Sequence, residues 1–181
     1  MTELEPLLAT LREGQRIGAI GPLVIEEAVA HAGHFVDAIA TEARSIIDLG
    51  SGGGLPGLVI AWCRPELRLT MVDRRAKRTD FLARAVRRLG LDARAVVING
   101  DVRALGRSGV HAGVYDAVTA RSFGPPDETL RLALPFVGSG GQILVSDPPG
   151  SDRWRHVLTA ELGEQVEVAS TGERLTVLRR R

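Results

Sequence analysis

The stretch that decides the fold is IIDLGSGGGLPG, residues 46–57, in which an apolar run ends in Asp48 and passes into a glycine-rich turn. A segment compatible with a helix begins at Leu55. This arrangement is typical of the carboxyl end of the first strand in an open α/β sheet, where nucleotide-like ligands bind. The stretch therefore predicts an α/β fold with a ligand site at the turn.

The acid before the turn indicates which ligand binds there. Asp48 would repel a pyrophosphate and attract the cationic amino-acid end of S-adenosylmethionine (AdoMet). The turn also matches the dinucleotide fingerprint, as Gly52-x-Gly54-x-x-Gly57, with Asp73 at a plausible distance for a ribose-binding acid. Asp48 and the lack of a separate substrate domain downstream favour AdoMet. A methyltransferase is therefore expected, with an NAD-binding oxidoreductase as the alternative.

Composition limits the class of protein. The 181 residues are 44% hydrophobic and 25% charged, as expected for one globular domain, 1–181, with a helical region at 1–43 and an α/β core at 44–181. No apolar run approaches the ~20 residues that span a bilayer, no signal sequence is visible, and the single cysteine fits a reducing compartment. We expect a cytoplasmic protein that is not bound to a membrane.

The net charge of +1 gives no strong overall field for nucleic acid. The histidines show no grouping typical of a metal site.

Hydrophobic periodicity predicts strands that alternate with helices. The predicted strands are residues 44–49, 67–72, 95–98, 114–119 and 142–145, followed by a hairpin of 165–169 and 175–178. The predicted helices are residues 3–12, 22–40, 55–63, 75–89 and 127–136. This order predicts the methyltransferase variant of the doubly wound fold, a mostly parallel sheet with an antiparallel C-terminal hairpin. Cys63 is expected to be buried on the apolar side of its helix.

Acids at three successive strand ends are expected to bind one ligand. Asp48 and the backbone amides of the turn would hold the methionine part of AdoMet. Asp73 would accept hydrogen bonds from both ribose hydroxyls, and Asp101 with the Val102 amide would border the adenine. Each acid alone could be a turn residue or a helix cap, but the set favours a cofactor site. The expected cofactor-binding residues are Asp48, Gly50, Ser51, Gly52, Leu55, Asp73, Asp101, Val102 and Arg121.

Arg121 follows the fourth predicted strand, where a methyl acceptor would lie, and is the expected catalytic residue. Its fork of donors could hold a guanine O6 or a phosphate, although its spacing also permits an ion pair with Asp127. Phe123 could stack on a base, but a place in the core is favoured. The basic residues of the helix at 75–89 would suit RNA phosphates.

Several of these motifs resemble those of the bacterial small-subunit ribosomal RNA guanine-N7 methyltransferases, the GidB or RsmG type. They are LPG at 55–57, KRTDFL at 77–82, ARSF at 120–123 and GERLTV at 172–177, with HFVD at 34–37 further upstream. The likeness covers roughly residues 17–181. It implies a class I AdoMet-dependent methyltransferase fold, AdoMet as cofactor, and small-subunit rRNA or the small ribosomal subunit as partner.

The sequence departs from the family pattern on the acceptor side. Ala38 replaces the serine of the upstream helix, and Asp147-Pro148-Pro149-Gly150 stands where the family tends to carry Leu-Lys-Gly. The family's N-terminal Trp-Asn and Asn-Leu-Thr elements have no counterpart in these residues. A small-molecule methyltransferase and a non-catalytic AdoMet-binding module therefore remain alternatives.

Overall fold

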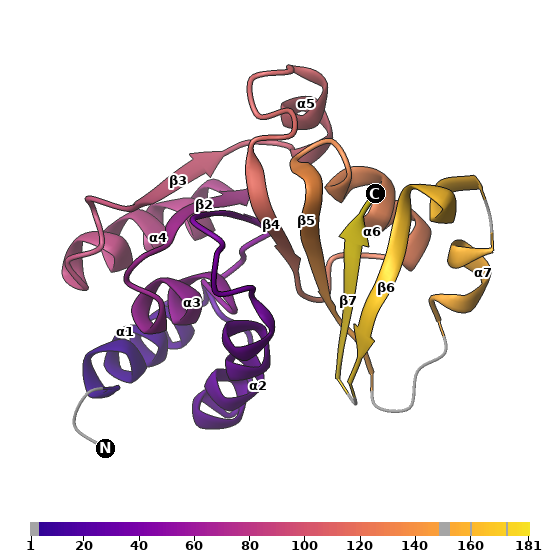
Figure 1. The fold of residues 1–181 in the computed structure, drawn as a ribbon. Coiled ribbons are helices and arrows are strands. Elements are labelled where there is room, and N and C mark those ends of the chain that lie inside the picture. Colours follow the sequence, from indigo (N-terminus) through magenta and orange to yellow (C-terminus); the bar gives the residue numbers. More distant parts are fainter. Residues whose placement is uncertain (1–3, 149–152, 160, 173) are drawn as a thin grey trace.

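A seven-stranded mixed sheet forms the centre of the computed structural model, which describes residues 4–148, 153–159, 161–172 and 174–181 (Figure 1). The strands are β1 Ser45–Leu49, β2 Arg68–Asp73, β3 Ala95–Asn99, β4 Tyr115–Ala120, β5 Val137–Ser146, β6 Val166–Thr171 and β7 Leu175–Arg180. Their order is β3-β2-β1-β4-β5-β7-β6. The first five are parallel, and β7 lies antiparallel between β5 and β6.

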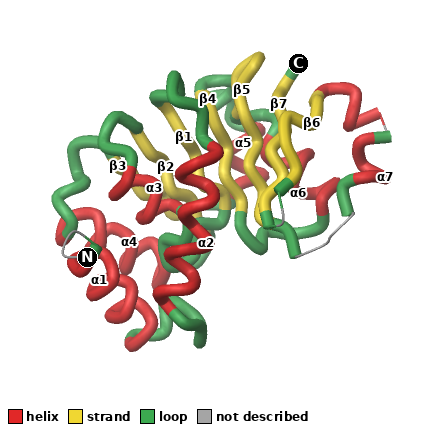
Figure 2. Tube along the Cα trace, turned by 60° about the horizontal axis from the view of Figure 1, so that its bottom comes forward, coloured by secondary structure: helices red, strands yellow, loops and turns green. Residues whose placement is uncertain are grey.

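Helices cover both faces of the sheet (Figure 2). One face carries α1 Glu5–Arg16, α2 Ile25–Ala38, α3 Gly57–Cys63 and α4 Ala76–Arg88. The other carries α5 Val102–Arg107 and α6 Pro126–Ala133, with α7 Arg155–Leu158 and a 3-10 turn, Glu161–Gln165, next to the C-terminal hairpin. Each face has its own apolar core, so the central strands are buried on both sides.

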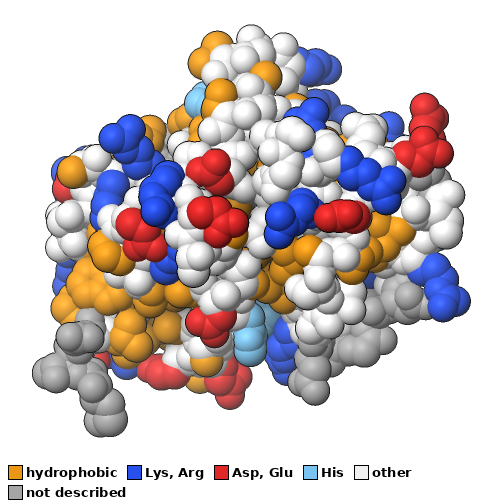
Figure 3. All heavy atoms as spheres, viewed as in Figure 1, with side chains coloured by type: hydrophobic (Ala, Val, Ile, Leu, Met, Phe, Trp, Pro, Cys, Tyr) orange, Lys and Arg blue, Asp and Glu red, His pale blue; other side chains and the backbone are white. Residues whose placement is uncertain are grey.

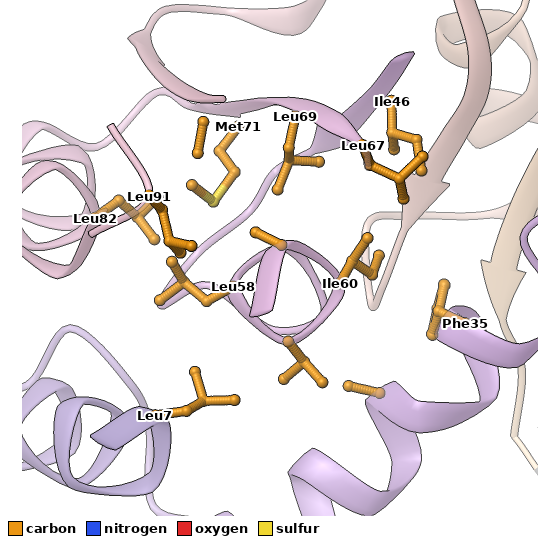
Figure 4. Close-up of a cluster of buried hydrophobic side chains, with 14 of the residues drawn as sticks. Leu7, Phe35, Ile46, Leu58, Ile60, Leu67, Leu69, Met71, Leu82 and Leu91 are labelled. Atoms are coloured by element: carbon orange, nitrogen blue, oxygen red, sulfur yellow. The ribbon is translucent and has the colours of Figure 1, made fainter. Parts of the chain in front are cut away.

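The short helix α3 is the centre of the first core (Figure 4). Its Leu58 and Ile60 are fully buried, and they lie among side chains of α1, α2 and β2, including Leu7, Phe35 and Met71. Complete burial of such a side chain contributes about 1.5–3 kcal/mol. This packing fixes the start of α3 against β1 and β2, and therefore fixes the glycine turn between β1 and α3.

The predicted fold class is confirmed, and so are the five parallel strands and the hairpin. Three short elements, α5, α7 and the 3-10 turn, were not predicted. β5 begins at Val137, five residues before the predicted start, and α2 begins at Ile25 rather than at Pro22. The predicted burial of Cys63 is wrong, because this side chain is exposed at the last position of α3.

Candidate active site

The glycine turn after β1 is closed by side chains from two other segments. Gly50 has φ +66°, and a Cβ built there would lie 2.7 Å from a ring carbon of Phe123. A Cβ on Gly53 would lie 2.1 Å from Ile20, in the segment between α1 and α2. Only glycine satisfies both positions, since one needs a left-handed backbone and both need close approach.

Three amides of the turn are used inside the protein. Ser51 N donates to Val72 O at 2.9 Å, Gly52 N to Asp73 Oδ2 at 2.9 Å, and Gly54 N to Ser51 O at 2.7 Å. The backbone amides of the turn were expected to hold the methionine part of AdoMet, but these three are already bonded within the protein. Their hydrogen bonds hold the turn against the end of β2, and this preorganises the walls of the cavity above it.

Asp48 lies beneath the turn and not at the open surface. Its side chain is 1% exposed, Oδ1 accepts a 2.8 Å hydrogen bond from Thr119 Oγ1, and Oδ2 has no hydrogen-bond partner among the described residues. A Cβ on Gly57 would lie 2.8 Å from that Oδ2. Burial raises the pKa of Asp48 to about 6, while the hydroxyls of Thr119 and Ser51, the backbone N–H of Gly57 and the charge of Arg121 act in the opposite direction.

Asp73 ends β2 and joins the turn to the next helix. Oδ2 accepts from Gly52 N, Oδ1 accepts from Arg75 N at 2.9 Å, and Arg78 Nη1 is 3.5 Å from Oδ2. The side chain is buried but lines a cavity. Because a carboxylate oxygen accepts about two hydrogen bonds, Oδ1, which has one donor, keeps capacity for a ligand hydroxyl.

Asp101 has a structural role of its own. It is the N-cap of α5, and its Oδ1 accepts from Ala104 N at 3.1 Å. Asp101 and Val102 also line the cavity that Asp73 lines. The capping alternative is therefore correct for this acid, and the cavity position is compatible with a second role.

Three adjoining cavities follow the carboxyl ends of the strands. The β2-end cavity, about 520 Å³, is lined by Gly50, Asp73, Asp101, Val102, Ser122 and Phe123, among others. The turn cavity, about 240 Å³, is lined by Ile20, Leu23, Gly50, Ser51, Gly52, Leu55, Arg121 and Ser122, among others. The α2 cavity, about 410 Å³, is lined by Leu23, His31, Arg121, Ser122, Asp147 and Arg174, among others.

Arg121 lines both the turn cavity and the α2 cavity. Its Nη1 is buried and has no hydrogen-bond partner among the described residues. The ion pairs of the described residues do not include the alternative one with Asp127. Burial lowers the pKa of its guanidinium, and the charge of Asp48 raises it. A guanidinium with an unused donor next to two cavities is available to a ligand.

Ser122 borders all three cavities and was not recognised in the sequence. It has φ +49°, the one positive value at a non-glycine residue in the described part of the chain. Such strain is concentrated at functional sites.

The segment between α1 and α2 was also not recognised in the sequence, although its Ile20 and Leu23 line the turn cavity. No sequence signal placed these residues there, since the tertiary packing alone brings them to the turn.

The residues that the structure describes contain no group of three or more His, Cys, Asp or Glu side chains that could hold a metal ion. None of their helices has the length and the apolar character needed to cross a membrane.

The sheet order and the cavities at its carboxyl edge define a class I AdoMet-dependent methyltransferase fold. A dinucleotide-binding fold places a parallel sixth strand next to β5, whereas here the antiparallel β7 occupies that position. The chain belongs to the family described as rRNA small subunit methyltransferase G, whose model matches residues 22–147.

Individual relatives agree with this family. The chain is 42% identical over 113 residues to ribosomal RNA small subunit methyltransferase G of Salinispora arenicola, covering 59% of this chain and 47% of that protein. It is 36% identical over 153 residues to the protein of the same name from Deinococcus radiodurans. That match covers 81% of this chain and 60% of the relative. The chain spans about half the length of the curated relatives that it matches. A methyltransferase structure from Geobacter sulfurreducens has the same fold, with a TM-score of 0.71 at 13% identity, covering 98% of this chain and 90% of that one.

Proposed function

We propose that the chain is an AdoMet-dependent methyltransferase that methylates N7 of a guanine in small-subunit (16S) rRNA. It would form one domain, 1–181, with a helical region at 1–43 and an α/β core at 44–181. The observation that carries the proposal is the position of Arg121 and Ser122, which border both the turn cavity and the α2 cavity. A methyl donor in one cavity and an acceptor in the other would meet at these residues.

The residues of the first two cavities fit AdoMet. AdoMet supplies an electrophilic methyl group on a sulfonium. Asp73 has acceptor capacity for a ribose hydroxyl, and Asp101 and Val102 lie further along the same cavity. Asp48, with one unpartnered buried oxygen, favours a cationic group above it in the turn cavity when it is ionised.

Methylation of the acceptor requires that the guanine is positioned correctly, and it does not require removal of a proton. Guanine N7 carries a lone pair and no proton, so no general base is required. The free donor of Arg121 would orient the base by its O6, and catalysis would come from holding the nucleophile in line with the methyl group. Arg74 and Arg75 are exposed beside the β2-end cavity, and basic side chains outside the cofactor would suit RNA phosphates. The partner would be small-subunit rRNA, in the cytoplasm.

The proposal is tested by methyl transfer from labelled AdoMet to small ribosomal subunits from a strain that lacks this gene. The labelled RNA is digested and its nucleosides are separated. Label in 7-methylguanosine is the expected result. Label in another nucleoside would reject the N7 assignment. No label, with S-adenosylhomocysteine still bound in calorimetry, would reject the RNA acceptor and direct the search to small molecules.

The role of Arg121 is tested separately. Arg121→Ala should lower the turnover number at least ten-fold and leave the affinity for S-adenosylhomocysteine within a few-fold, because the guanidinium is proposed to orient the acceptor. Arg107→Ala, at an exposed position of α5, is the matched control and should behave like the wild type. Equal loss of turnover and of ligand affinity in Arg121→Ala would contradict this role.

A further inference from the structure

His31 is a titratable side chain of the α2 cavity that the proposed function does not use. It comes from the second turn of α2, and its ring packs edge-on against His34 and Phe35, with centroid distances of 5.9 and 6.1 Å. Its Nδ1 is buried and has no hydrogen-bond partner among the described residues. A buried polar atom without a partner is costly, and the cavity beside it has room for a ligand that would supply one.

The surroundings of His31 favour the neutral imidazole over the cation. Burial lowers the pKa of His31, and the charges of Arg121, His34 and Arg174 lower it further. The other charged groups that line the cavity are Glu27, Asp147 and Arg153. A neutral imidazole with its proton on Nε2 offers Nδ1 as a hydrogen-bond acceptor.

Guanine has complementary chemistry along one edge. Its O6 accepts a hydrogen bond, and its N1–H and N2–H₂ groups donate. If the guanidinium of Arg121 donates to O6, the next group along the edge must accept. His31 and Arg121 line the same cavity and present an acceptor and a donor, respectively. Leu23 and Val24, 36% and 54% exposed, provide apolar surface at the same cavity for the face of a base.

We propose that His31 is a specificity-determining residue of the acceptor site, where its Nδ1 accepts a hydrogen bond from the N1–H and N2–H₂ edge of the guanine to be methylated. This inference rests on the proposed function and adds a second group that reads the base. A neutral imidazole has a further advantage over a cation at this position, because N7 methylation leaves a positive charge on the guanine.

Two variants separate hydrogen bonding from packing. His31→Phe keeps a ring without an acceptor, and His31→Asn keeps a polar atom close to the position of Nδ1. In methyl transfer to small subunits that lack this modification, His31→Phe should lower kcat/KM about ten-fold, equivalent to about 1.4 kcal/mol, and His31→Asn should recover most of the loss. Affinity for S-adenosylhomocysteine should not change. His156→Phe, at an exposed position of α7, is the matched control.

A second measurement does not depend on RNA. In long-range ¹H–¹⁵N spectra of the protein saturated with S-adenosylhomocysteine, Nδ1 of His31 should be unprotonated. Its resonance should move when guanosine 5′-monophosphate is added and stay in place with adenosine 5′-monophosphate, whose N1 accepts instead of donating. If His31→Phe is as active as the wild type, or if Nδ1 does not respond to the guanosine nucleotide, the inference is overturned.

The outcomes also separate this inference from the proposed function. An active wild type with unaffected His31 variants would retain the methyltransferase and reject the role of His31. An inactive wild type would reject RNA methylation, and the nucleotide titration would then decide on His31 alone.

Discussion

Thr119 Oγ1 donates a 2.8 Å hydrogen bond to Asp48 Oδ1, between residues that are directly paired in the register of β1 and β4. Both side chains are buried. This bond satisfies one carboxylate oxygen and leaves Oδ2 without a partner among the described residues. Burial therefore raises the pKa of Asp48, and the neighbouring hydrogen-bond donors offset this effect only in part.

The raised pKa predicts that Asp48 lowers the stability of the fold when it is ionised. The folded protein binds this proton more tightly than the unfolded chain does, so the free energy of unfolding falls as the pH rises from 3.8 to about 6. Asp48→Asn has no such charge. As the pH rises from 3.8 to about 6, the wild type should therefore lose up to about 3 kcal/mol of unfolding free energy relative to Asp48→Asn. Urea unfolding at pH 4 and pH 8 measures the change, and a constant difference would contradict it.

The same acid should make ligand binding dependent on pH. We expect the affinity for S-adenosylhomocysteine to fall as the pH drops through about 6, because the protonated acid no longer attracts the ammonium group. In Asp48→Asn the affinity should be about ten-fold lower at pH 8 and should lack this step. Calorimetry across the pH range tests both points, and an unchanged step in the variant would assign the titration to another group.

Gly50→Ala should disrupt the ligand site, whereas Gly109→Ala should not. Both glycines have positive φ, +66° and +74°, but a Cβ on Gly109 meets no atom within 4 Å, while one on Gly50 meets Phe123 at 2.7 Å. Gly109→Ala therefore reports the cost of the left-handed backbone alone, about 1–2 kcal/mol. Gly50→Ala should cost more and should lower the affinity for S-adenosylhomocysteine at least ten-fold. Equal effects of the two variants would show that the approach of Phe123 is unimportant.

Variants of Asp101 can separate its cap from its proposed contact with adenine. Asp101→Ala removes the hydrogen bond to Ala104 N and should cost about 1 kcal/mol of stability. Asp101→Ser retains a capping oxygen and should preserve stability. If Asp101 also contacts the adenine, both variants should bind S-adenosylhomocysteine several-fold more weakly. Wild-type affinity in Asp101→Ser would leave the residue with its capping role only.

The link between β5 and α7 should depend on Asp147. Both of its carboxylate oxygens lie 3.0 Å from Nε1 of Trp154, a side chain that is 4% exposed. Asp147→Ala leaves this buried donor without its acceptor and should lower the unfolding free energy by about 1–3 kcal/mol. Trp154→Phe removes the donor as well, so the double variant should lose less than the sum of the two single losses. Additive losses would rule out the pair as a stabilising unit.

The elements that could be predicted from the sequence are those with a clear apolar period. The helix with Phe81, Leu82 and Val86 on one face was predicted to within a residue or two at each end. α5 was missed because it has six residues and buries only Val102. The first half of β5 was missed because Gly138, Gly140 and Gly141 indicate a turn in the sequence, where the pairing of β5 with β4 and β7 is not visible.

The candidate site was partly predictable for the same reason. Asp73 and Asp101 follow strands, so their positions at one edge of the sheet were expected, and both line the β2-end cavity. The α2 cavity could not be predicted, since residues from α2, from the ends of β4 and β5 and from the hairpin form it. On α2, residues 34–37 match a motif of the family. His31, which lines the cavity, lies outside that motif.

The pairing of Asp48 with Thr119 has a consequence for how β1 can change during evolution. Ile46 packs in one core and Ile47 in the other, so the strand faces alternate with every residue. Inserting or deleting a single residue before Asp48 would turn an aliphatic side chain toward Gly57 and move the carboxylate to the opposite face. We therefore expect substitutions but no gaps through β1 when homologous sequences are aligned.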